Sequence, residues 1–133
     1  MAHPPRYDED DPFLRELRGV ALALPEAREK ISHGHPVFFT KKVFAIFGAV
    51  VKGDHFSDRY RQSVVFLPDA IERAALIEEE RYFVPAYYGP AGWLGLSFAT
   101  EEPDWQEVAE LVEMSYRNTA TKTLVRRLDE SRT

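Results

Sequence analysis

Three of the four histidines, at positions 33, 35 and 55, have the spacing that comes nearest to a metal site. Imidazole is the commonest metal ligand in proteins. Gly34 and Pro36, however, indicate that His33 and His35 lie on a turn rather than on a strand that aligns both rings. No nearby pair of carboxylates completes a ligand set, so we expect solvated histidines, His55 included, and no metal site.

Residues for nucleophilic or acid–base catalysis do not form a recognisable pattern. The serines that fall near predicted strands and helices lack the Gly-x-Ser-x-Gly context of a nucleophile elbow: Ser63, Ser97 and Ser115. The carboxylates that come closest to an acid–base pair lie at a predicted helix start, where acids favour the helix dipole: Glu101, Glu102 and Asp104. The glycines fit neither a phosphate loop nor a dinucleotide fingerprint: Gly89, Gly92 and Gly95. We expect no catalytic residue and no cofactor, and a non-enzymatic protein is favoured over an enzyme.

Basic residues are concentrated in the middle of an acidic chain. The formal net charge is −5, yet residues 28–61 carry seven Lys or Arg against three Asp or Glu. The candidate anion-binding residues are five cations: Lys41, Lys42, Arg59, Arg61 and Arg81. With Tyr60 and Tyr82 beside them they suit a nucleic acid, whose backbone takes Lys and Arg and whose bases stack on aromatic rings. The alternative is a set of loops kept soluble by charge, and the net negative charge favours it.

An aromatic loop is the second candidate site. Tyr87, Tyr88 and Trp93 surround a stretch rich in Gly and Pro. A loop with so much aromatic surface either packs back on the sheet or lines a pocket. Beside basic residues, such a pocket can hold a small anionic ligand.

The elements that position these residues are predicted by periodicity. Asp11 and Pro12 begin a helix whose apolar residues recur at three- and four-residue spacing up to Pro25. Residues 26–35 are polar and end in a turn, and residues 37–39, 43–51 and 62–67 read as strands of an antiparallel meander. The loop at 52–61 is charged.

A second helix and a second group of strands follow. Residues 68–77 predict a helix with Ile71, Ala74 and Ala75 facing inward, and Ile77 is a further candidate for that side. Strands then end near Pro85 and span 93–98. A long helix begins at 103–105, and a further helical turn covers 124–128. The order α-β-β-β-α-β-β-α predicts an α+β fold with an antiparallel sheet backed by helices.

Length and composition predict one domain. We expect residues 1–11 to be a frayed tail and residues 12–133 a single domain. The absence of cysteine excludes thiolate nucleophiles, disulfides and zinc sites that use sulfur. No apolar run approaches the ~20 residues of a membrane-spanning helix, and the first residues lack the layout of a secretion signal. We therefore expect a cytoplasmic protein without membrane contact.

Four short motifs, in order, resemble the MmcQ/YjbR family. They are Leu24-Pro25-Glu26-Ala27, Lys42-Val43-Phe44-Ala45, Pro85-x-Tyr87 followed by Gly92-Trp93, and Ser115-Tyr116. The resemblance covers residues 13–128 and implies a YjbR-like fold similar to frataxin. It also implies DNA binding, the label this family carries, although the family's biochemical role is unsettled. The matching signature positions are pocket or structural residues: Pro85, Tyr87, Gly92, Trp93 and Tyr116.

Three functions follow as hypotheses. The first is DNA binding by the five cations together with Tyr87 and Trp93. The second is a small anionic ligand held under the Tyr87–Trp93 loop, with or without catalysis. The third is a protein-interaction module that uses the acidic segment 101–113, for which the sequence names no partner. The first requires that the cations converge in space beside the aromatic loop.

Overall fold

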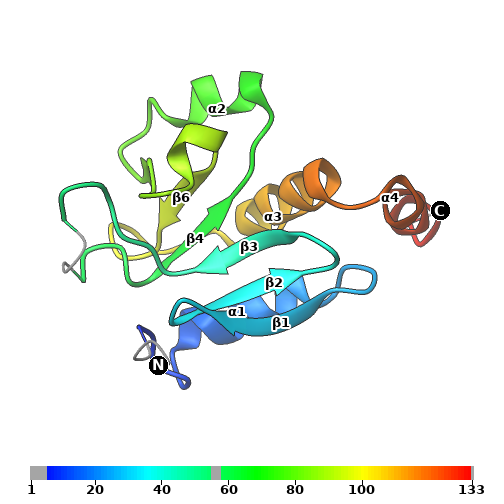
Figure 1. The fold of residues 1–133 in the computed structure, drawn as a ribbon, viewed down its shortest axis with the longest axis horizontal. Helices are drawn as coiled ribbons and strands as arrows, with labels where there is room; N and C mark the ends of the chain where they lie inside the picture. The colour runs from blue at the N-terminus through cyan, green and yellow to red at the C-terminus, as the bar shows by residue number, and fades with distance from the viewer. Residues whose placement is uncertain (1–5, 55–57, 133) are drawn as a thin grey trace.

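A computed structural model describes residues 6–54 and 58–132, in which a six-stranded antiparallel sheet is combined with four α-helices (Figure 1). The helices are α1 (Pro12–Ala21), α2 (Ala70–Leu76), α3 (Trp105–Thr119) and α4 (Lys122–Glu130), with a short 3-10 helix η1 (Gly89–Ala91). The strands are β1 (Arg28–Ser32), β2 (His35–Phe39), β3 (Val43–Phe47), β4 (Ser63–Phe66), β5 (Tyr82–Phe83) and β6 (Leu94–Ser97). Their order in the sheet is β1-β2-β3-β4-β6-β5. The predicted α+β class and antiparallel sheet are confirmed.

Helices α1 and α3 cover one face of the sheet, which we call the helix face (Figure 1). Asp11 begins α1, because its carboxylate accepts a hydrogen bond from Phe13 N at 2.8 Å. The centres of both apolar stripes are buried, and they belong to one core with Phe38, Phe47 and Phe66. Burial of this apolar surface supplies most of the driving force for folding.

A β-bulge in β3 determines how α3 sits on this face. Phe38 pairs with Ala45 and Phe39 with Val43, so Phe44 is an extra residue without a partner on β2. Phe44 and Ala45 both belong to the helix-face core. On its other side, β3 pairs with β4, and the last pair at this end is Ala45 with Phe66. The next pair of the ladder would be Phe44 with Leu67, but these two residues are not paired.

The hydroxyl of Ser115 in α3 bridges Phe44 and Leu67. Ser115 Oγ donates to Phe44 O at 2.6 Å and accepts from Leu67 N at 2.8 Å. Two buried backbone groups that the ladder leaves open are therefore satisfied by one side chain from a helix. The next residue, Tyr116, is also buried, and its hydroxyl donates to Pro25 O at 2.8 Å.

The opposite face of the sheet, the open face, is covered by side chains and a loop instead of helices. Val37, Ile46 and Val65 are buried there, and Trp93 packs against them. Gly95 of β6 pairs with Val65 and lies on the same face of the sheet. A Cβ at Gly95 would lie 2.2 Å from the Phe83 ring. Tyr60 stacks on that ring with centroids 3.8 Å apart. Only glycine allows this close approach.

Two segments differ from the sequence-based expectation. Residues 28–32 form strand β1 rather than part of a polar turn region. The turn itself is confined to His33 and Gly34, with φ of 52° and 84°, which is the type I′ geometry of a two-residue hairpin. In α2 no residue is buried, and Ile71, Ala74 and Ala75 face solvent instead of the core. None of the described helices is long and apolar enough to cross a membrane.

Replacing Ser115 with Ala removes both hydrogen bonds while keeping the size of the side chain nearly constant. We expect the free energy of unfolding to fall by about 1–3 kcal/mol, because two buried backbone groups lose their partner. Thr119→Ala is the matched control, since the Thr119 hydroxyl bonds carbonyls of its own helix. Urea denaturation measures both. Equal effects of the two substitutions would contradict the bridging role of Ser115.

Candidate functional site

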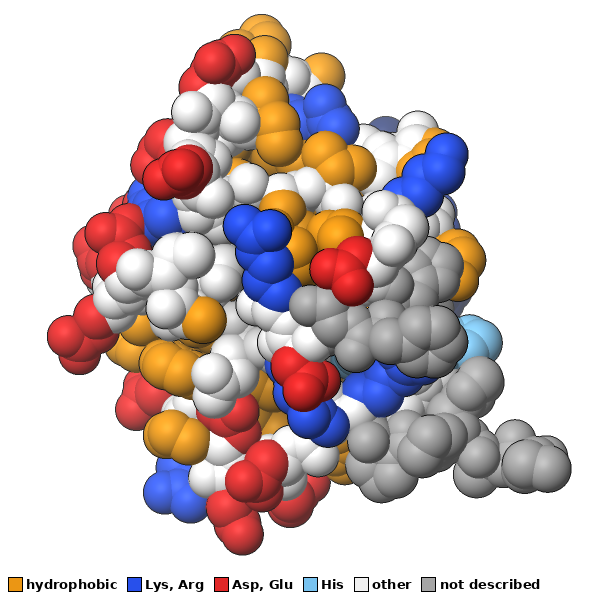
Figure 2. All heavy atoms as spheres, turned by 90° about the vertical axis from the view of Figure 1, so that its left-hand side faces the viewer, with side chains coloured by type: hydrophobic (Ala, Val, Ile, Leu, Met, Phe, Trp, Pro, Cys, Tyr) orange, Lys and Arg blue, Asp and Glu red, His pale blue; other side chains and the backbone are white. Residues whose placement is uncertain are grey.

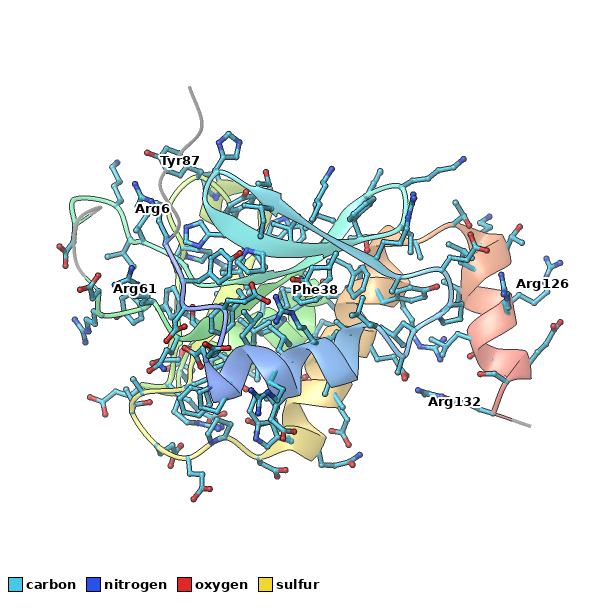
Figure 3. All side chains as sticks on the ribbon, turned by 90° about the horizontal axis from the view of Figure 1, so that it is seen from below. Arg6, Phe38, Arg61, Tyr87, Arg126 and Arg132 are labelled. Carbon is cyan, nitrogen blue, oxygen red and sulfur yellow. The ribbon has the colours of Figure 1, made fainter. Side chains whose placement is uncertain are left out.

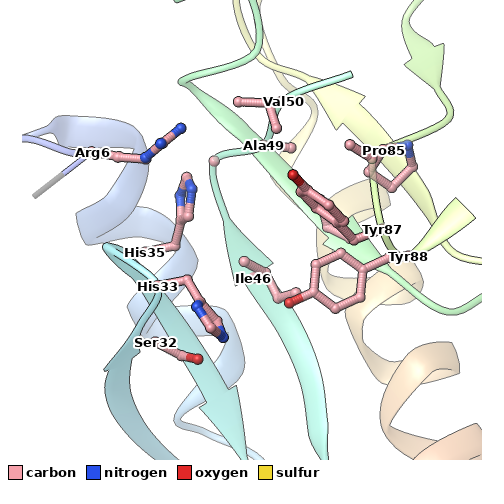
Figure 4. Close-up of a pocket in the computed structure, with 13 residues that line it drawn as sticks. Arg6, Ser32, His33, His35, Ile46, Ala49, Val50, Pro85, Tyr87 and Tyr88 are labelled. Carbon is pink, nitrogen blue, oxygen red and sulfur yellow. The ribbon is translucent and has the colours of Figure 1, made fainter. Parts of the chain in front are cut away.

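A cavity of about 390 Å³ lies on the open face of the sheet, between the β1–β2 turn and the segment 85–88 (Figure 4). Strands β3 and β4 supply its floor through Ile46 and Val65. The remaining described lining residues come from four segments: Arg6, Ser32, His33, His35, Gly48, Ala49, Val50, Pro85, Ala86, Tyr87 and Tyr88. The lining is therefore apolar at the base and polar at the rim.

Tyrosines form one side of the cavity mouth. Tyr87 has φ of 69° and a side chain 77% exposed, and Tyr88 is also exposed. A left-handed backbone is unfavourable for a residue with a bulky side chain, and such strain is frequent at binding sites. Ala86 N donates to Val50 O at 2.8 Å, which connects the tyrosine segment 85–88 to the lining segment 48–50. Figure 4 shows the two rings turned toward the side that carries the histidines.

His35 forms the facing wall and was expected to be a solvated turn residue. It is instead half-buried, and its Nδ1 lies 3.1 Å from Phe47 O. Because a carbonyl only accepts, Nδ1 carries the proton, and in the neutral ring Nε2 is left as an acceptor. Gly48, with φ of 87°, allows this packing, since a Cβ there would lie 2.9 Å from His35 Nδ1.

The electrostatic surroundings keep His35 neutral. Burial lowers the pKa of His35 below its usual value, and the charges of Arg6, His33 and Arg61 lower it further. The hydrogen bond to Phe47 O opposes these effects only in part. Around the described residues no cluster of three or more His, Asp or Glu side chains is placed to hold a metal ion. His55 lies outside the described residues.

Arg6 is a cavity residue that residue type and spacing did not single out, since it lies in a Pro-rich acidic segment. Its backbone N donates to Gly34 O at 3.0 Å, and its carbonyl accepts from Arg61 Nε at 3.2 Å. These two contacts hold Arg6 beside the β1–β2 turn at the cavity rim. Seen from below the sheet, Arg6, Arg61 and Tyr87 lie at one end of the molecule and Arg126 and Arg132 at the other (Figure 3).

The five predicted cations are not brought together. Lys41 and Lys42 occupy the β2–β3 turn, whereas Arg59 and Arg61 precede β4, which places them at opposite ends of β3 (Figure 1). A five-residue strand spans roughly 16 Å. On the face in Figure 2, acidic side chains are interspersed with the basic ones.

Arg81, the fifth predicted cation, is surrounded by carboxylates. Its guanidinium forms ion pairs of 2.8–2.9 Å with three carboxylates: Glu79, Glu101 and Glu107. The hydrogen bond to Glu107 is the largest of the effects that raise the pKa of Arg81. These contacts fasten the start of α3 to the chain before β5. The positive charge of Arg81 is thus compensated within the protein.

The family-signature positions divide between the cavity and the core. Pro85 and Tyr87 line the cavity. Trp93 packs on the open-face cluster with its ring 5.9 Å from that of Tyr88, and Gly92 ends η1 with φ of 97°. Tyr116 lies in the helix-face core, on the far side of the sheet from the cavity.

Comparisons with known proteins agree with this architecture. The model of the YjbR family matches residues 22–118. Among solved structures, the chain is similar to a Deinococcus radiodurans protein with a DUF419 domain, with a TM-score of 0.62 and 18% sequence identity over 87% of each chain. No curated protein matches the sequence. At this identity the solved structure supports the fold alone. The family model covers most of the chain, including the strands and tyrosines that form the cavity. The protein therefore belongs to the YjbR family.

Proposed function

We propose that the protein binds a small organic anion with a flat apolar body, in the cavity between His35 and the Tyr87–Tyr88 corner. The cavity carries the proposal. Its volume of about 390 Å³ falls in the range of small-molecule sites, and its apolar base with a few polar rim groups is the usual composition of such sites.

Charge at the rim favours an anion. Arg6 lines the cavity, Arg61, which also pairs with Asp58 at 3.4 Å, donates to the carbonyl of Arg6, and the described lining residues include no Asp or Glu. His35 adds a neutral acceptor to this wall. A ligand that combines one anionic group with one hydrogen-bond donor matches these residues.

The tyrosines favour a flat ligand body. Tyr87 and Tyr88 present exposed rings at the mouth, and Ile46 and Val65 form an apolar floor. Aromatic rings bind planar groups by stacking, which adds about 0.5–1.5 kcal/mol to the burial of apolar surface. The left-handed backbone at Tyr87 sets the direction in which its side chain leaves the loop.

DNA binding is a second candidate, supported by a different observation. On β1–β3 the open-face positions contain no carboxylate among the described residues, although the protein is acidic. Lys30 Nζ lies 4.5 Å and Arg28 Cζ 5.1 Å from the centroid of the Phe39 ring. Lys41 and Lys42 follow directly in the turn, so two of the predicted cations join two that were not predicted. A single strand, whose flexible backbone can follow these cations, is the form of DNA that suits this arrangement.

Anilinonaphthalene sulfonate, a flat aromatic anion that fluoresces in apolar sites, tests the cavity. We expect saturable binding, weakened about tenfold by Tyr87→Ala and about fivefold by Arg6→Gln, from loss of a stacking ring and of a nearby charge. Arg126→Gln, at the far end of the molecule, is the control and leaves the affinity unchanged. Non-saturable binding, or equal affinity in all variants, would refute the site.

The neutral state of His35 predicts a pH-dependent stability. Because the pKa of His35 is lower in the folded protein than in the unfolded chain, the unfolded chain binds the proton first as the pH falls below about 6.5. The free energy of unfolding should therefore decrease from neutral pH toward acidic pH, and His35→Asn should remove part of that decrease. His33→Asn, in the same turn, is the control, and denaturant titrations across this range measure all three proteins. An unchanged slope in His35→Asn would contradict the assignment.

Salt titrations test the DNA candidate. Binding of a fluorescent single strand should weaken steeply from low to physiological salt, and Lys41→Gln with Lys42→Gln should reduce the slope by about 1–2. Replacing Lys122 and Arg126 with Gln serves as a charge-matched control on α4. If neither single-stranded nor duplex DNA binds at low ionic strength, this candidate is eliminated.

A further inference from the structure

Helix α2 exposes the apolar side of an amphipathic helix. Ile71, Ala74 and Ala75 share one side at i, i+3 and i+4 spacing, and all three are exposed, with Ile71 at 86%. No residue of α2 is buried, although its last residue, Leu76, and the following Ile77 are partly buried against the core. A helix this short is not stable by itself. Its apolar side is the kind of surface that a partner covers.

Acidic side chains border this apolar surface. Four exposed carboxylates in and around α2 form no ion pair with another residue of the described part: Asp69, Glu72, Glu78 and Glu80. Arg73 is the only cation within residues 69–80. In Figure 2, whose upper part corresponds to the position of α2 in Figure 1, acidic side chains lie along the left-hand border of the apolar ones. The surface is therefore apolar at its centre and negative at its rim.

We propose that the α2 surface (Asp69, Ile71, Glu72, Ala74, Ala75, Glu78 and Glu80) docks a basic amphipathic helix of another protein. Apolar side chains of the partner cover Ile71, while its Lys and Arg residues meet the carboxylates. A second copy of this chain is a poor occupant, because a two-fold pairing of the surface places the same carboxylates opposite each other. This inference is independent of the cavity and of its ligand.

Two synthetic helical peptides of the same lysine, leucine and alanine composition test the proposal. One has its leucines on a single side of the helix, and the other has them scrambled. We expect the amphipathic peptide to bind the full chain, in fluorescence anisotropy, at least tenfold more tightly than the scrambled one. Ile71→Ser should weaken that binding about tenfold, the equivalent of about 1.4 kcal/mol. The matched control is Ile31→Ser, which changes an exposed isoleucine on β1.

The outcomes separate the alternatives. Both variants should keep the thermal stability of the original protein, since each changes an exposed side chain. Absence of binding at low salt, equal binding of the two peptides, or equal effects of the two serine variants would overturn the proposal. A dimer in sedimentation velocity that Ile71→Ser dissociates would overturn it in favour of self-association.

Discussion

One hydroxyl group, that of Ser115, joins the long helix to the centre of the sheet. The bulge in β3 separates the Phe44 carbonyl from the Leu67 amide, and Ser115 Oγ bonds both. A longer side chain would hold α3 away from the strands, and an apolar one would leave two buried polar groups without partners. The bulge, the small residue and the close approach of α3 therefore depend on each other. The Ser115-Tyr116 pair in the sequence has a structural explanation.

This arrangement gives the sheet two chemically different faces. The helix face is covered by α1 and α3, whereas within the described residues no α-helix covers the open face, where the segment 84–93 lies. A face without helices leaves room for a cavity, and the carboxylates of α3 lie on the other side of the sheet. An acidic protein can in this way present an anion-binding surface, so its net charge is a poor guide to its ligand.

Local pattern predicted the fold class and most elements, because helices α1 and α3 and strands β2, β3, β4 and β6 each bury a side that their sequence marks as apolar. It did not predict β1, an edge strand of mostly charged residues, none of which is buried. Its inward orientation for α2 was wrong, since periodicity shows that a helix has an apolar side but not what covers it. In the site, the aromatic corner was selected from its residue types. Arg6 and the role of His35 could not be predicted, because both depend on contacts between segments distant in the sequence.

The stack of Gly95, Phe83 and Tyr60 links the edge of the sheet to the cavity wall. The outer edge of the Phe83 ring lies against Gly95, and Tyr60 stacks on Phe83. Tyr60 O accepts a hydrogen bond from Ala49 N, a lining residue. The position of Ala49 in the cavity wall therefore depends on Gly95, which is separated from it by the rings of Phe83 and Tyr60 and does not line the cavity. During divergence of the family, exchange of Gly95 for a larger residue would reshape the binding volume while every lining side chain stayed the same.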